Sequence, residues 1–218
     1  MNLNSFEHIA KQLRCPAQAE GLEIGERMNQ SNERLIKRTV EAAKLNAEDK
    51  VLEIGHGNGK HISDLFAIET SITYTGLDIS SLMHEQAKEH NEILIKKGLA
   101  SFHLYDGACL PFPDNTFNKI FSVNTLYFVD NPLAYIEELE RVSQEKSLMV
   151  FGLVDKSFMK DKPFQENGFR LYGEKELRDL FKNSPFKVLS IQKGSDQIHT
   201  NTGEFLDRAY IVLSVQKY

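Results

Sequence analysis

Three glycines alternate with other residues directly after a short apolar run near position 50. The run Lys50–Ile54 (KVLEI) is typical of a buried strand, apolar residues recur at helical spacing from Ile62 to Ile68, and the glycines between are Gly55, Gly57 and Gly59. Glycine permits positive φ and close approach of a ligand, and the N-terminus of the next helix offers unpaired N–H groups to an anion. The segment therefore predicts a ligand-binding loop, although α/β proteins also use such glycines merely to turn the chain.

Two carboxylates accompany this turn. Glu53 lies two residues before Gly55, where an acid can meet a ligand's ammonium group, and Asp78 follows the strand-like run Ile72–Leu77 (ITYTGL). An acid at the end of a second strand can accept both hydroxyls of a ribose. The dinucleotide fingerprint G-x-G-x-x-G needs a glycine where Lys60 stands, so the pattern is unfavourable for a dinucleotide.

Alternating strands and helices must position these residues. Further strands are predicted over Ser101–Tyr105, Asn118–Val123, Ser147–Val154, Phe186–Ile191 and Ala209–Val215. Helices are predicted from the possible N-cap Ser80 to Gly98, from Pro132 to Val142, and over Glu174–Asn183. Strands separated by helices form a parallel sheet, and the last two, joined by a loop, can pair antiparallel. The predicted fold class is α/β, a Rossmann-like doubly wound sheet of seven strands, mostly parallel, with the last strand antiparallel.

The first 48 residues are predicted to form a helical cap. One helix is expected over Phe6–Leu13 and a second over Asn32–Leu45, capped by Ser31. A segment this short cannot easily hold its own core, so we expect one domain over residues 1–218, with the cap at 1–48 and the Rossmann-like core at 49–218.

Composition excludes several classes of function. The 218 residues carry 26 basic and 31 acidic side chains, a net charge of −5 without a basic block, so nucleic acid is disfavoured as a substrate. No apolar run is long enough to span a membrane, and the N-terminus lacks the apolar region of a secretory signal. The seven histidines and two cysteines show no metal-ligand spacing, so no metal is expected, and the cysteine usage suits the cytoplasm.

A later segment extends the pattern. Asp106–Phe117 reads DGACLPFPDNTF and precedes the predicted fourth strand and Asn124. With the glycine loop, it resembles the class I S-adenosylmethionine-dependent methyltransferases, and most closely their small-molecule branch of ubiquinone and menaquinone C-methyltransferases. The resemblance covers about residues 48–154. Asn118 and Gln144–Lys146 depart from that branch's pattern, which weakens the match to the branch more than the match to the cofactor site.

The resemblance implies a cofactor site. Glu53, Gly55, Gly57 and Gly59 would form the turn under the methionine portion of S-adenosylmethionine. Asp78 would hold the ribose hydroxyls and Ile79 would pack on adenine. Asp106 would accept from the adenine amino group, with Gly107 and Ala108 beside it. Asn124 would lie near the sulfonium through its backbone, and S-adenosylhomocysteine would be the product.

The sequence shows no obligatory catalytic machinery. G-x-S-x-G and H-E-x-x-H motifs are absent from the sequence, and methyl transfer from a sulfonium needs a base only when the acceptor must lose a proton. His61 and Tyr127 are weak candidates for a base, against the alternatives of a hydrogen-bonded histidine and a packing tyrosine. Asn124–Tyr127 (NTLY) resembles the Asn-Pro-Pro-Tyr signature of amino-directed DNA methyltransferases but lacks both prolines.

Two segments have a possible role at an acceptor site. Residues 155–173 contain four aromatic side chains and form either a flap over the acceptor or a surface loop anchored by packing. Met28-Asn29 either closes over the cofactor, as in the branch that the chain resembles, or begins an ordinary helix.

Three functions are consistent with these features. The first is transfer of a methyl group from S-adenosylmethionine to a small-molecule acceptor by in-line displacement. The second is a catalytically silent protein that binds S-adenosylmethionine. The third, disfavoured by Lys60, is a nicotinamide-dependent oxidoreductase.

Overall fold

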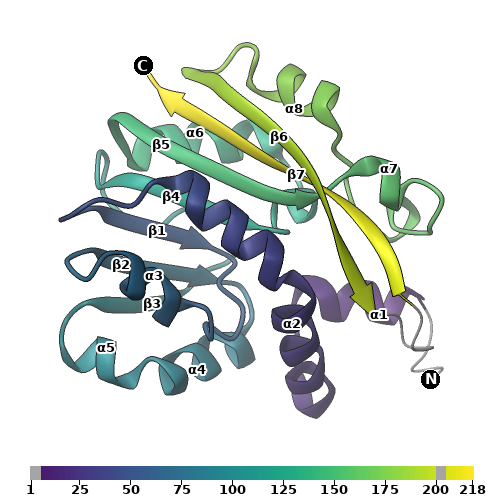
Figure 1. The fold of residues 1–218 in the computed structure, drawn as a ribbon, viewed down its shortest axis with the longest axis horizontal. Helices are drawn as coiled ribbons and strands as arrows, with labels where there is room; N and C mark the ends of the chain where they lie inside the picture. The colour runs from purple at the N-terminus through teal and green to yellow at the C-terminus, as the bar shows by residue number, and fades with distance from the viewer. Residues whose placement is uncertain (1–5, 200–204) are drawn as a thin grey trace.

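A seven-stranded sheet forms the centre of the molecule in a computed structural model that describes residues 6–199 and 205–218 (Figure 1). The strands are β1 (Lys50–Ile54), β2 (Thr73–Asp78), β3 (Ala100–Leu104), β4 (Phe117–Val123), β5 (Ser143–Val154), β6 (Phe186–His199) and β7 (Phe205–Lys217). Their order is β3-β2-β1-β4-β5-β7-β6, and β7 runs antiparallel to both of its neighbours while the other pairs are parallel. The predicted fold class is confirmed.

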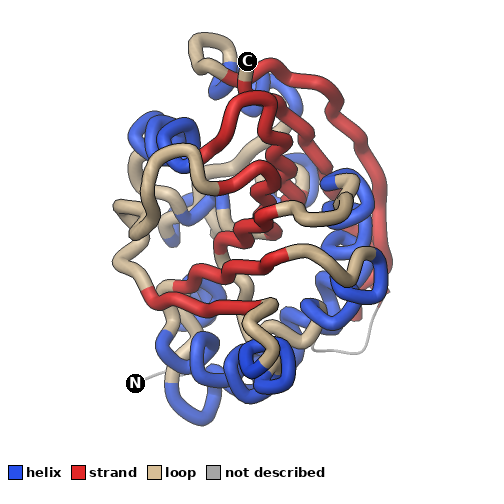
Figure 2. The backbone as a smooth tube through the Cα atoms, turned by 90° about the vertical axis from the view of Figure 1, so that its left-hand side faces the viewer, coloured by secondary structure: helices blue, strands red, loops and turns tan. Residues whose placement is uncertain are grey.

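Helices cover both faces of this sheet (Figure 2). They are α1 (Phe6–Arg14), α2 (Gln18–Ala43), α3 (Ile62–Ile68), α4 (Ser81–His90), α5 (Glu92–Lys96), α6 (Pro132–Val142), α7 (Lys156–Met159) and α8 (Glu174–Phe181), with short 3-10 turns η1 (Leu126–Phe128) and η2 (Gln165–Asn167). Helix α2 crosses β4, β5 and β7 on the face nearest the viewer in Figure 1. Among the described residues, no helix has both the length and the apolar character needed to cross a membrane.

Alternation along the strands builds one core on each face. Ile120 and Met149 pack with α6 and α8 on one side, whereas their neighbours Phe121 and Val150 pack with α2 and α3 on the other. Successive side chains of a strand point to opposite faces, so central strands buried on both sides are apolar at consecutive positions. The two cores hold the sheet rigid and leave its carboxyl edge to position a site.

The second helix differs from the prediction. It runs unbroken from Gln18 to Ala43. Ser31, expected as its N-cap, lies inside the helix, and its hydroxyl donates a hydrogen bond to the Met28 carbonyl. Two glycines lie in its first half, where they permit close packing. A Cβ on Gly21 would lie 2.8 Å from Leu82, and one on Gly25 would lie 2.9 Å from Met83, so glycine lets α2 approach α4.

Two other boundaries also differ. The helix predicted from Ser80 to Gly98 is interrupted at Asn91, whose side chain donates to the carbonyls of Gly59 and Ala87. The last two strands are longer than predicted, because polar residues continue the β6–β7 pairing beyond the sheet, where Asp196 lies opposite Arg208. Each difference brings a distant segment to the site.

Candidate active site

A cavity of about 650 Å³ opens at the carboxyl edge of the parallel strands. Its wall is formed by the segments that follow β1, β2, β3 and β4, closed on the other side by α1, α2 and the start of α6. The carboxyl edge, where strand order reverses between β1 and β4, is the usual ligand site of open α/β sheets. Nine of the ten predicted cofactor positions lie in this wall: Glu53, Gly55, Gly57, Asp78, Ile79, Asp106, Gly107, Ala108 and Asn124.

The glycine loop needs glycine for different reasons at its three positions. All three have positive φ, at +80° for Gly55, +56° for Gly57 and +66° for Gly59. A Cβ on Gly55 would collide with Thr125, and one on Gly59 would lie 2.9 Å from Ala87. Gly59 packs against α4 and does not line the cavity. A Cβ on Gly57 meets no described atom within 4 Å, so this glycine borders open space.

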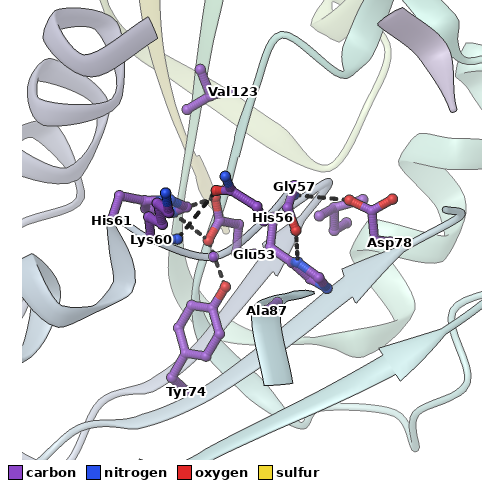
Figure 3. A network of polar contacts seen from close by, with 12 residues as sticks. Glu53, His56, Gly57, Lys60, His61, Tyr74, Asp78, Ala87 and Val123 are labelled. Carbon is purple, nitrogen blue, oxygen red and sulfur yellow. Dashed lines mark hydrogen bonds and ion pairs between the residues drawn. The ribbon is translucent and has the colours of Figure 1, made fainter. Parts of the chain in front are cut away.

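Asp78 holds the loop in place from the tip of β2. One carboxylate oxygen accepts the Gly57 N–H at 2.9 Å (Figure 3). The other accepts the Ser80 N–H at 2.8 Å. Burial raises the pKa of Asp78 above its usual value, against the lowering effect of these N–H donors and of nearby His56. Each oxygen keeps a second lone pair, so the carboxylate can still accept from a diol.

Glu53 joins two buried rings at the base of the cavity. It accepts a hydrogen bond from the Tyr74 hydroxyl at 2.5 Å, and His61 Nε2 lies 2.9 and 3.0 Å from its two oxygens (Figure 3). Burial would lower the pKa of His61, but the Glu53 carboxylate offsets it and the pKa is raised. The histidine nitrogen is thus committed to Glu53.

Asp106 shapes the loop after β3. Its Oδ1 accepts the N–H groups of Ala108 and Cys109 at 2.9 and 3.3 Å, and these bonds lower the pKa of its exposed carboxyl. Gly107 has a φ of +86°, which lets the loop turn around the carboxylate. The arrangement keeps an ionised acceptor on the cavity wall.

Asn124 follows β4 with a positive φ of +57°. Its backbone N–H donates to the Gly152 carbonyl at 2.8 Å, its Oδ1 accepts from Val154, and its Nδ2 donates to Asn32. Asparagine tolerates this backbone conformation better than most residues.

Tyr127 is placed away from the cavity. Its ring packs against Phe128 and Phe169, with centroids 4.9 and 5.4 Å away, and it is not among the described residues that line the wall. Residues 155–173, all of which are described, contribute nothing to the wall either. Phe164 and Phe169 pack on each other and Phe164 packs on Phe6, as expected for a loop anchored by aromatic contacts.

Several cavity residues come from the cap and were not identified from the sequence. Arg14 pairs with Asp130 at 3.0 Å across the mouth, and Asn32 also lines the wall, as does Tyr135 of α6. Met28-Asn29, the segment singled out in the sequence, lies in the wall too, but in the middle of α2. The other contacts join residues more than 90 positions apart, so no local signal announces them.

Comparison with known proteins shows that the chain is similar to methyltransferases. Residues 52–151 match the family model described as a methyltransferase domain. An uncharacterised protein of Methanocaldococcus jannaschii is 34% identical over 157 residues, which are 71% of this chain and 66% of that protein. A 27-O-demethylrifamycin SV methyltransferase of Amycolatopsis mediterranei is 25% identical over 125 residues, 57% of this chain and 46% of its own length.

Solved structures agree on the fold. The crystal structure of a SAM dependent methyltransferase from Aquifex aeolicus superposes with a TM-score of 0.62 at 20% identity, covering 99% of this chain and 100% of that one. The chain therefore has the fold of the class I S-adenosylmethionine-dependent methyltransferases. The match of residues 52–151 to the methyltransferase domain model and the structural neighbours together imply S-adenosylmethionine as the cofactor.

Proposed function

We propose that the chain transfers the methyl group of S-adenosylmethionine to a small-molecule acceptor. The observation that carries this proposal is the convergence of Glu53, Asp78 and Asp106 with the glycine loop on one cavity. Open space beside Gly57 and the spare lone pairs of Asp78 fit an adenosyl amino acid. A volume of about 650 Å³ lies within the range of small-molecule sites.

Each of these residues has a role in binding. Glu53 would meet the ammonium group, Gly55 and Gly57 would let the ligand approach the backbone, and Asp78 would accept from the ribose. The purine would be held by Ile79, Asp106, Gly107 and Ala108, with Asn124 near the sulfur. When bound, the cofactor supplies an electrophilic methyl group on a sulfonium.

The protein's contribution to the reaction would then be alignment and exclusion of water. Helices α1 and α2 cover the cavity opposite the strand tips, which favours in-line displacement in a dry site. His61 is held on Glu53 and Tyr127 is buried among aromatic rings, so we assign neither as a base for the acceptor. The structure supports a site that holds donor and acceptor in line without an obligatory base.

A small acceptor fits the charges at the mouth better than a nucleic acid. Asp130 and Glu137 are exposed there, and Arg14 is paired with Asp130. Acidic groups at the rim would repel a phosphate backbone. Among small acceptors, the Leu110–Phe117 segment favours those of the ubiquinone and menaquinone C-methyltransferase branch, and quinols therefore belong in the acceptor screen.

We also propose that residues 1–48 and 49–218 act as one domain. The wall needs residues from both parts, and Ser80 donates to the Pro16 carbonyl at 2.5 Å across the boundary. Limited proteolysis should release no stable core from residues 49–218, whereas a persistent fragment that binds S-adenosylhomocysteine would contradict this proposal.

Calorimetric titration with S-adenosylmethionine and S-adenosylhomocysteine tests the proposed function. We expect binding well below millimolar, and a loss of at least tenfold in Asp78→Ala, since two hydrogen bonds to a charged group each contribute about 1.5–3 kcal/mol. Asp179→Ala removes an exposed acid on α8 and should leave the affinity unchanged.

A turnover screen over phenols, quinols, amines and carboxylic acids completes the test. Formation of S-adenosylhomocysteine with any of them supports methyl transfer. Tight binding without turnover across the screen would favour the silent binding protein instead. The oxidoreductase alternative receives no support from the family match, and titration with NAD should show no binding.

A further inference from the structure

Two asparagine amides meet in the cavity wall between α2 and the end of β4. Asn124 Nδ2 lies 2.9 Å from Asn32 Oδ1, and both residues line the cavity. The oxygen and nitrogen of an amide have nearly the same shape, so its orientation follows from partners that can only donate or only accept.

Such partners lie on both sides of this pair. The backbone N–H of Val154, which can only donate, lies 3.2 Å from Asn124 Oδ1, so the nitrogen of Asn124 must face Asn32. On the other side, Nη1 of Arg208 lies 3.0 Å from Asn32 Oδ1, and a guanidinium has no acceptor. The oxygen of Asn32 therefore accepts two hydrogen bonds, and a flipped amide would face two donors.

Arg208 is itself fixed. It forms a bidentate pair with Asp196, its cross-strand neighbour on β6, at 3.0 and 2.8 Å, and it donates to the Ser31 carbonyl at 2.7 Å. Arg208 is 6% exposed and Asp196 5%. The extended β6–β7 hairpin thus holds a cation against α2 and sets the orientation of Asn32.

The nitrogen of Asn32 is left as a donor without a protein partner within residues 6–199 and 205–218. The cavity that Asn32 lines is acidic, because Glu53, Asp78 and Asp106 line it too. A ligand whose ammonium group meets Glu53 needs a separate donor for a carboxylate on the same carbon atom, because Glu53 and Asp78 would repel it.

We propose that Asn32 binds the α-carboxylate of the amino-acid portion of S-adenosylmethionine, and that Arg208 and Asp196 are positioning residues for that amide. This assignment rests on the proposed function. Its chemistry is a charge-assisted hydrogen bond from a neutral amide, whose direction is set by a buried ion pair on another element of the fold.

Asn32→Asp tests the assignment with little change of shape. The variant keeps an oxygen for Arg208 and Asn124 and replaces the donor with an anionic oxygen. Calorimetry should show at least a tenfold loss of affinity for S-adenosylhomocysteine, because one hydrogen bond to a charged group becomes a repulsion. Affinity for the decarboxylated analogue, in which an aminopropyl chain replaces the amino-acid portion, should not fall.

Two further variants serve as controls. Gln30→Glu makes the same change of net charge on the exposed side of α2 and should bind S-adenosylhomocysteine as the wild type does. Asn32→Ala removes the donor without adding charge, so it should lower the affinity for S-adenosylhomocysteine but not the affinity for the decarboxylated analogue. Thermal unfolding checks that each variant is folded.

Equal weakening of both ligands, or wild-type affinity for S-adenosylhomocysteine in both Asn32 variants, would overturn the assignment while leaving the proposed function intact. A wild-type chain that binds neither ligand would overturn the proposed function and this assignment with it.

Discussion

The two walls of the cavity are built in different ways. On the cofactor side, the glycine loop and the tips of β1 and β2 lie within about one strand–helix–strand unit, and Asp78 holds Gly57 only 21 positions away. On the cap side, contacts join residues far apart in the sequence, such as Arg14 with Asp130 and Asn32 with Arg208. One wall is local and made largely of backbone, whereas the other is assembled from side chains.

This difference explains what each wall can reveal about function. Positive φ values and carboxylates at strand tips follow from local sequence, so the residues of the glycine-loop wall could be predicted. The cap side depends on how α1, α2 and the β6–β7 hairpin dock, which brings together residues from segments far apart in the sequence. We therefore expect substitutions in the cap wall to act through long-range packing and substitutions in the loop to act through backbone strain.

The largest effect is expected at Arg208. Arg208→Met leaves Asp196 buried without its partner, and breaking a buried ion pair in this way costs about 3–5 kcal/mol of unfolding free energy. Urea unfolding measures the change. Arg208→Met combined with Asp196→Leu removes both charges and should recover most of the loss; an equally unstable double variant would show that the pair is not the cause.

A comparison of Gly55→Ala with Gly57→Ala comes next. Both have positive φ, but only the Cβ at Gly55 would collide with Thr125. We expect Gly55→Ala to lower the free energy of unfolding by about 2–4 kcal/mol. Gly57→Ala should lower it by about 1–2 kcal/mol, which is the cost of a left-handed backbone alone. Gly57→Ala should nevertheless strongly reduce the affinity for S-adenosylhomocysteine, because the added methyl group enters the cavity. Equal destabilisation by the two changes would contradict the distinction.

The smallest effect concerns the pH dependence of stability at His61. Its folded pKa is raised above 6.5 through Glu53, with a smaller contribution from Asp64, despite the opposing effect of burial. The stabilisation is therefore complete below pH 6.5 and lost as the pH rises through the folded pKa. The difference in unfolding free energy between wild type and His61→Gln should shrink from pH 6 to pH 9.

His103 provides the matched comparison for that measurement. Burial lowers its pKa, so wild type compared with His103→Gln should lose stability as the pH falls, the opposite sign. The same pH trend in both variants would mean that the trend at His61 does not come from its pairing with Glu53.

The sequence was sufficient to predict the fold class, and nine of the ten positions that it predicts for the cofactor line one cavity. The alternation of strands and helices follows from local apolar patterns, and the acids at the strand tips can be identified once the strand ends are predicted. The close packing of Gly21 and Gly25 against α4 could not be predicted, because it depends on a contact between two distant helices. The roles of Asn91 and Asp196 also depend on tertiary contacts: Asn91 donates to the glycine loop, and Asp196 holds Arg208 against the cap.

A crystal structure with S-adenosylhomocysteine tests the central claim most directly. We predict the ribose hydroxyls within hydrogen-bond distance of Asp78, the purine between Ile79 and Ala108, and the amino-acid portion beside Gly55 and Glu53. A ligand bound elsewhere, or an Asp78 carboxylate turned away from the ribose, would contradict the account.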